Sequence, residues 1–348
     1  MKWPWRKASN DRLVFSFSAE TLVYGRCVDG RLVRCGVEQR GEDTPLAFAR
    51  RARALGLQSG HVTALLRPQE CQLLQIEAPT VPAAELKSAA RWRIKDLVDA
   101  HLDDLTLDVM VLGDDRARNK RQLFVAAART QAIRDISDWS HAAGLELGVI
   151  DIRETAQRNL QSAQAQLQGR SESASAALML QGDECLLTIC ANGELFYARR
   201  LAWDRSAVGG DTLRPVASAA QPGAGASSEE FAMLDIVDYG ADAPTGAGVA
   251  SAGSGSEEGL RFVIELQRSL DLWERSWPDL PLGSLMIQMN EDTQAVAEVL
   301  RKVLALPIEI LQPELVFADL AVTAGTPAVR SAVVPLLGAL LRSESRQL

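Results

Sequence analysis

Three short apolar runs, separated by turn dipeptides, lie in the middle of the chain over residues 176–204. The runs cover residues 178–180, 186–190 and 195–201, and the turns are Gly182-Asp183 and Asn192-Gly193. Asn-Gly between two runs of strand length indicates a hairpin, because a tight primed turn needs positive φ at both central residues. This stretch therefore predicts three antiparallel strands.

The same pattern occurs near the N-terminus, over residues 13–17, 22–28 and 32–37, with Asp29-Gly30 as the second turn. Each triplet leads, directly or after a linker, to an amphipathic helix and a further strand. A repeat of this length indicates an internal duplication. Two such halves predict an α/β chain of the duplicated ribonuclease-H-like, or actin-like, type.

Composition limits the function classes. The chain has 348 residues, of which 47% are hydrophobic and 24% charged, so it is long enough for two ordinary globular domains. A net charge of −8 argues against nucleic-acid binding through phosphate neutralisation. No apolar run approaches the roughly 18–20 residues needed to span a bilayer, and the N-terminus lacks the apolar core of a secretion signal. We expect a cytoplasmic protein.

The five cysteines are odd in number, lie on predicted strands and show no CxxC spacing, so buried free thiols are favoured over metal or redox chemistry. The three histidines have no evident partners. No metal site is predicted. The cysteines are Cys27, Cys35, Cys71, Cys185 and Cys190.

The predicted domains follow from the repeat. Residues 12–170 form a first actin-like domain, which contains an inserted β-α-β-β block at 71–128, and residues 176–348 form a second. Residues 205–256 are rich in Gly, Ala, Ser and Pro and predict a disordered insertion. An apolar island at 229–240 within it is either a displaced edge strand or a linear motif for a partner.

Helices are also predicted outside the strand triplets. A helix at 45–57 is expected to bury Leu46, Phe48 and Leu55, and a polar-faced helix is expected at 153–167. Further helices are predicted at 131–143, 257–277, 293–304 and 328–342, with Pro335 inside the last.

The helix predicted at 81–99 carries the candidate partner-binding residues. Leu86, Ala90, Ile94 and Leu97 fall on one stripe, which we expect to be core. Trp92 points away from it and either packs on a neighbouring subdomain or receives a partner peptide. Exposed Trp and Arg are common interface anchors, so the candidates are Arg91, Trp92 and Lys95.

Residues 1–11 form a basic and aromatic tip. Trp prefers the membrane interface, and Lys and Arg prefer anionic headgroups, so this tip is a candidate membrane-surface contact; a frayed terminus is the alternative. The candidate residues are Trp3, Trp5, Arg6 and Lys7.

Three helix sequences carry a family resemblance. EAPTVPAAELKSAARWRIKDLVD, LQRSLDLWE and SAVVPLLGALLR resemble the MshI family of MSHA pilus biogenesis. That family belongs with PilM of type IV pili and, more distantly, with the cytoplasmic part of the type II secretion L protein. The resemblance implies an actin-like protein at the inner face of the inner membrane, which binds the cytoplasmic tail of a PilN-like membrane protein. Other platform components, including the assembly ATPase, are further possible partners.

In PilM the tail lies between the first actin-like subdomain and the inserted one. By this resemblance, the helix at 83–98 flanks the corresponding groove.

Actin-like ATPases hold phosphates on two turns, each typically Asp-x-Gly; the Asp organises Mg²⁺ and its water, and the Gly admits the phosphates. Here the first turn has Ser16 and Ser18, and the second has Gly182, followed by Asp183 in a hairpin position. By the same resemblance, a Gly-Gly pair near the adenosine is expected after the predicted strand at 285–289. This chain has Asn290-Glu291-Asp292 there instead. We predict a non-catalytic scaffold without a nucleotide or metal cofactor. An ATP-binding switch using Mg-ATP is the alternative, and a sugar-kinase-like enzyme is a third.

Overall fold

The computed structural model describes residues 10–112, 122–170, 173–203 and 254–343. The candidate membrane tip with Trp3, Trp5, Arg6 and Lys7 lies outside the described residues, as do the 229–240 island and nearly all of the predicted 205–256 insertion.

The first five-stranded sheet has the order β3-β2-β1-β4-β8. Strands β1, β2 and β3 are antiparallel, whereas β4 and β8 run parallel to β1. The turn between β2 and β3 has φ of 49° at Asp29 and 82° at Gly30, as a primed turn requires. The strands are β1 (Asp11–Phe17), β2 (Thr21–Val28), β3 (Arg31–Gln39), β4 (His61–Leu65) and β8 (Leu147–Asp151).

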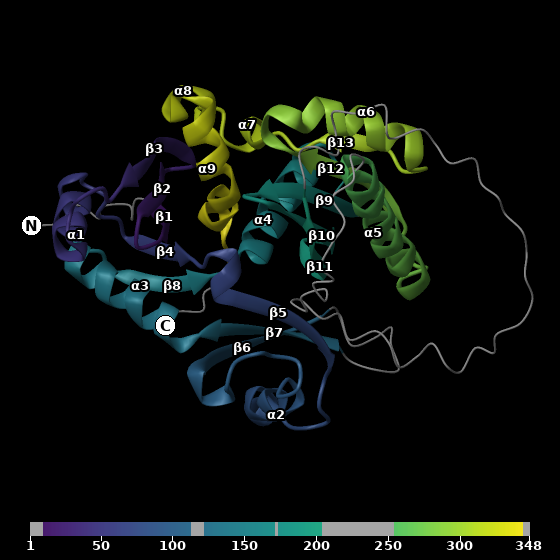
Figure 1. The fold of residues 1–348 in the computed structure, drawn as a ribbon, viewed down its shortest axis with the longest axis horizontal. Helices are drawn as coiled ribbons and strands as arrows, with labels where there is room; N and C mark the ends of the chain where they lie inside the picture. Colours follow the sequence, from purple (N-terminus) through teal and green to yellow (C-terminus); the bar gives the residue numbers. More distant parts are fainter. Residues whose placement is uncertain (1–9, 113–121, 171–172, 204–253, 344–348) are drawn as a thin grey trace, which may run out of the picture.

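The second five-stranded sheet repeats this order as β11-β10-β9-β12-β13, with the same strand directions. Asn192 and Gly193 have φ of 52° and 78° between β10 and β11. The repeated topology confirms the duplicated, actin-like α/β fold (Figure 1). The strands are β9 (Ala174–Gln181), β10 (Glu184–Ala191), β11 (Glu194–Ala202), β12 (Leu282–Gln288) and β13 (Ile308–Ile310).

A third sheet, with the order β5-β7-β6, confirms the inserted β-α-β-β block. Ala90 of its helix α2 (Leu86–Arg93) and Ile94, which directly follows the helix, are completely buried, as the stripe predicts. The helix is shorter than the expected 81–99, since one 3-10 turn (Ala83–Glu85) precedes it and the helix ends at Arg93. The strands are β5 (Cys71–Glu77), β6 (Leu105–Val111) and β7 (Gln122–Arg129).

Two helices cover the first sheet. Helix α1 (Pro45–Ala54) begins after Thr44, whose hydroxyl accepts from the Ala47 N–H, and α3 (Thr130–Ala143) ends at the left-handed Gly144. Phe48 is buried as expected, but the expectation for Leu46 is wrong, because its side chain is 52% exposed. At about 100° per residue, the two side chains point to nearly opposite sides of the helix.

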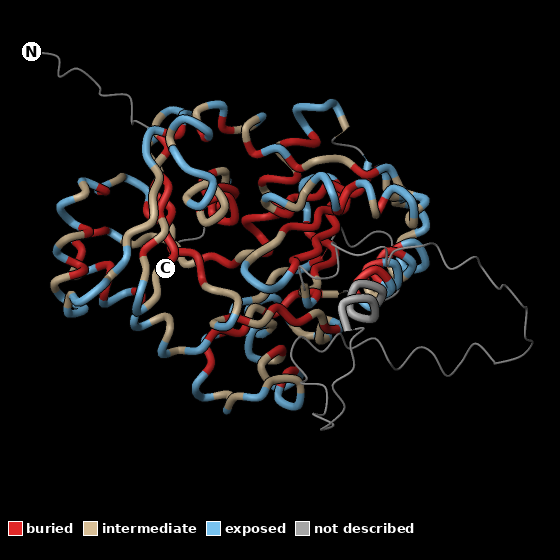
Figure 2. Tube along the Cα trace, turned by 45° about the horizontal axis from the view of Figure 1, so that its top comes forward, coloured by how far each residue is buried: buried red, intermediate tan, exposed pale blue. Residues whose placement is uncertain are grey.

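Two further helices, α5 (Ser254–Ser276) and α6 (Thr293–Val303), supply the core of the second half. Leu266, Leu270 and Trp273 of α5 are buried against the sheet, and the Trp273 indole N–H donates to the Leu280 carbonyl at 3.0 Å. Figure 2 shows buried residues through the interior of both halves and exposed ones on the outer surfaces of the helices.

Helix α4 (Arg153–Leu167) has the predicted polar face, but this face is buried rather than solvated. The Gln157 amide donates to the carbonyls of Ala177 (3.0 Å) and Leu186 (2.8 Å) in the second sheet. The Gln161 amide donates to the Ser175 carbonyl at 2.7 Å. Steps of four and then three residues place Gln157, Gln161 and Gln164 on one helix face, which we call the glutamine ladder.

The C-terminal segment returns to the first sheet. Helices α8 (Leu320–Ala324) and α9 (Pro327–Leu337) pack on β2 and β3, and a 3-10 turn (Gly338–Leu341) follows, so the helix expected at 328–342 ends soon after Pro335. The Arg342 guanidinium pairs with Asp151 at 2.8 Å. Gly338 touches α4 so closely that an added Cβ would lie 1.7 Å from the Ala156 carbonyl oxygen. The short α7 (Pro313–Val316) precedes these helices.

We predict that Gln161→Ala lowers the free energy of unfolding by about 2–4 kcal/mol, because it leaves a cavity and deprives the buried Ser175 and Thr188 groups of their partner. Chemical denaturation of the full chain measures this change. Gln166→Ala, at an exposed position of the same helix, is the control and is expected to change stability little. Equal effects of the two substitutions would contradict the role of the ladder.

Candidate functional site

The two turns with the predicted degenerate phosphate loops face one cleft between the two halves. Ser16, at the end of β1, and Ser18 line one side, whereas Gly182 and Asp183 line the other. The cleft has a volume of about 580 Å³. The fold thus brings together all four residues, although more than 160 positions separate the two turns in the sequence.

The side chain of Arg153 reaches the first turn. Its Nη2 donates to Ser16 Oγ at 3.2 Å, and its Nε donates to the Leu66 carbonyl at 3.2 Å. Desolvation lowers the pKa of Arg153 to about 10, so the guanidinium remains charged at neutral pH. Within the described ranges, no carboxylate forms an ion pair with it.

The first turn therefore carries a cation and a hydroxyl where ATP-binding proteins of this fold carry the magnesium-organising carboxylate. These residues do not fit a magnesium–phosphate site at that turn. Arg153 was not predicted from the sequence, because it follows β8 and reaches Ser16 through the strand order β1-β4-β8. No local pattern signals this contact.

The second turn has the geometry of a hairpin. Gly182 has φ of 76°, and the Asp183 carbonyl accepts from the Trp203 N–H at 3.1 Å. Asn290, which follows β12, also lines the cleft.

Arg200, which also lines the cleft, connects three parts of the molecule. From β11 it pairs with Glu154 of α4 at 2.9 Å, and it donates to the carbonyls of Pro68 and Cys71. Desolvation disfavours the charged guanidinium and lowers the pKa of Arg200. The negative charge of Glu154 and its hydrogen bond outweigh this effect, so the pKa of Arg200 lies above its ordinary value. The Glu154 side chain is 1% exposed and that of Arg200 is 19% exposed, so this ion pair is largely buried.

The predicted partner-binding residues lie on or just after α2 and differ in their surroundings. Trp92 is 71% exposed, and Lys95 is also exposed. Arg91 instead donates to the Leu102 carbonyl and pairs with Asp103 at 3.2 Å, so it supports the loop that leads into β6. Trp92 and Lys95 are thus accessible to a partner.

All five cysteines lie on strands and have free thiols, as predicted. Cys35 departs from the expectation of burial, since it lies partly exposed on β3. Burial raises the pKa of the Cys190 thiol to about 12.

The described ranges contain no group of three or more His, Cys, Asp or Glu side chains placed to hold a metal ion. None of their helices combines the length and apolarity needed to cross a membrane.

We predict that Glu154→Gln lowers the free energy of unfolding by about 3–5 kcal/mol, because it leaves the largely buried Arg200 guanidinium without its counter-charge. Asp319→Asn removes the carboxylate of an exposed pair with Arg31 and is the matched control, with stability essentially unchanged. Urea denaturation at neutral pH compares the two variants. A stable Glu154→Gln protein would show that the pair does not hold the halves together.

Comparisons with known proteins agree with the fold. Residues 61–214 match the family of the type IV pilus assembly protein PilM. The solved PilM–PilN type IV pilus biogenesis complex matches with a TM-score of 0.63 at 16% identity, over 95% of this chain and 98% of that one. No curated protein sequence matches the chain significantly.

Two weaker structural matches have TM-scores below 0.5. The cytoplasmic domain of EpsL, an inner-membrane component of the type II secretion system of Vibrio cholerae, matches with a TM-score of 0.39 at 13% identity, over 60% of this chain and 79% of that one. A protein of unknown function with an actin-like ATPase fold, from Bacteroides thetaiotaomicron, matches with a TM-score of 0.42 at 8% identity. The match covers 89% of this chain and 94% of that one. The chain is thus similar to PilM in sequence over residues 61–214 and in fold over nearly its whole length.

Proposed function

We propose that this chain is a non-catalytic, PilM-like scaffold of a type IV pilus assembly platform of the MSHA type. It acts at the cytoplasmic face of the inner membrane and binds the cytoplasmic tail of a PilN-like membrane protein. The observation that carries this proposal is the PilM family match over residues 61–214, which contains the whole inserted subdomain and Trp92. The MshI-like helix sequences support the MSHA assignment.

The chemistry of the cleft supports a scaffold rather than an ATPase. Arg153 and Ser16 stand at the first turn, where a magnesium-dependent nucleotide site needs a carboxylate. A fixed cation there attracts anions but cannot organise Mg²⁺ and its water.

The inserted subdomain supports a peptide-binding role. Trp92 presents its ring to solvent on α2, and a nearby exposed Lys95 adds charge. A large exposed aromatic side chain is favourable at an interface, because its burial by a partner removes much apolar area from water. The tail therefore docks against Trp92.

A second candidate function is an ATP-binding switch in the same machine. The cleft volume of about 580 Å³ favours it, because small-molecule sites commonly have about 300–1,000 Å³.

Calorimetric titration separates the two functions. We expect no saturable heat with Mg-ATP up to millimolar concentration, and saturable binding of a synthetic PilN-like N-terminal tail peptide. Trp92→Ala is expected to weaken peptide binding by roughly tenfold to a hundredfold, through the loss of a buried aromatic anchor. Ser88→Ala, at an exposed position of the same helix, is the control.

Micromolar binding of Mg-ATP at one site would replace the scaffold with the switch. Unchanged peptide affinity in Trp92→Ala would move the tail site away from α2.

A further inference from the structure

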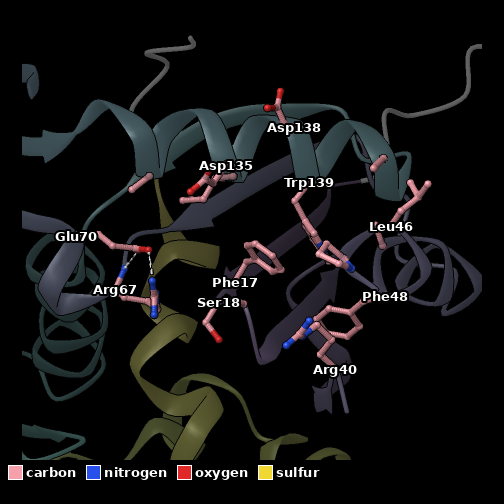
Figure 3. A pocket seen from close by; sticks show the side chains of 16 residues that line it. Phe17, Ser18, Arg40, Leu46, Phe48, Arg67, Glu70, Asp135, Asp138 and Trp139 are labelled. Atoms are coloured by element: carbon pink, nitrogen blue, oxygen red, sulfur yellow. Dashed lines mark hydrogen bonds and ion pairs between the residues drawn. The ribbon is translucent and has the colours of Figure 1, made fainter. Parts of the chain in front are cut away.

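A second cavity, of about 460 Å³, lies between α1 and α3 of the first half. Three aromatic rings gather at it, as Figure 3 shows. The rings of Phe17 and Trp139 stack with centroids 4.6 Å apart, and the Phe48 ring lies 6.2 Å from that of Trp139. The exposed Leu46 completes an apolar surface that is accessible from outside.

Two nitrogen donors in the cavity wall lack acceptors. The indole Nε1 of Trp139 and the Nε of Arg40 are buried and have no hydrogen-bond partner among the described residues. The Trp139 residue is 5% exposed. Buried donors of this kind are rare because they lose their bond to water without replacing it. A ligand that brings a carbonyl oxygen into the cavity satisfies such a donor.

The charges around the cavity leave an excess of carboxylates. Arg40 pairs with Glu20 at 2.8 Å, and Arg67 pairs with Glu70 at 2.6 Å, so both cations of the wall are neutralised. The remaining acids are Asp135 and Asp138, on α3 above the rings in Figure 3. Asp135 accepts a hydrogen bond from the Gln131 amide at 2.7 Å, and neither acid has an ion pair in the described part of the chain.

From these three features we propose a second docking site, which takes a short apolar and basic peptide segment of a partner protein. A bulky aliphatic or aromatic side chain enters the cavity over the Phe17, Phe48 and Trp139 rings. A peptide carbonyl accepts from Trp139 Nε1, and a Lys or Arg of the same segment faces Asp135 and Asp138.

This site goes beyond the proposed function, because its elements differ from those of the tail site. The cavity is built on α1, α3 and the end of β1, whereas Trp92 lies on α2 of the inserted block. A chain with both sites joins two partners at once.

Fluorescence anisotropy of the full chain with labelled octapeptides tests this proposal. The probe is the apolar and basic peptide GLIKRLKG, and the controls are the acidic GLIEELEG and the polar basic GSSKRSKG. We expect saturable binding of the first peptide alone. The double variant Asp135→Asn/Asp138→Asn is expected to weaken it by about tenfold and to reduce its salt dependence.

Matched variants separate the individual contacts. Trp139→Phe keeps a ring but removes the N–H, so it is expected to weaken binding severalfold. Asp104→Asn, at an exposed acid outside the cavity, is expected to leave the affinity unchanged. Because the two aspartates lie on the surface, their variant tests the site even if Trp139→Phe perturbs folding.

Absence of saturable binding at millimolar peptide would overturn the proposal. Equal binding of the acidic peptide, or an unchanged affinity in the double aspartate variant, would also overturn it. A peptide of residues 1–10 of this chain serves as a further probe. If it binds the cavity more tightly than GLIKRLKG, the occupant is the chain's own N-terminus and the partner assignment fails. None of these results alters the Trp92-dependent tail titration, so the two proposals fail independently.

Discussion

The glutamine ladder of α4 is the interaction on which the arrangement of the two halves depends. This helix follows the first sheet in sequence, yet Gln157 and Gln161 hydrogen-bond to backbone carbonyls of the second. Gln164 donates to the Ile310 carbonyl at 3.0 Å and accepts from the Gln312 N–H at 2.7 Å. A buried amide that loses such partners cannot recover them from water, so the ladder holds α4 at one register against β9, β10 and β13.

The same helix determines the chemistry of the cleft. Arg153 is its first residue, and the ladder, which begins about one turn later at Gln157, fixes where that guanidinium lies beside Ser16. The buried Arg200–Glu154 pair and the Arg342–Asp151 pair add further links between segments distant in sequence. A nucleotide-driven hinge would have to break several of these buried interactions together. These links support the proposed scaffold role, in which α2 and the α1–α3 cavity keep constant positions.

Local signals in the sequence predicted much of the fold. Asp29-Gly30 and Asn192-Gly193 define primed turns by backbone chemistry alone, and the exposure of Trp92 follows from its angle on the helix. The burial of α4 could not be predicted in this way, because a polar helix face looks solvated until its acceptors on another sheet are known. The contact of Arg153 with Ser16 and the cavity around Trp139 also depend on strand order and helix packing rather than on neighbouring residues.

The distance across the cleft, between a residue of the first half and one of the second, tests the rigid-scaffold account most directly. Spin labels at Gln69→Cys and Glu184→Cys, in a Cys35→Ser background, report this distance by pulsed electron paramagnetic resonance. The account predicts one narrow distance distribution that is unchanged by Mg-ATP. A second population, or a shift of several ångströms when Mg-ATP is added, would contradict it and indicate a nucleotide-driven closure.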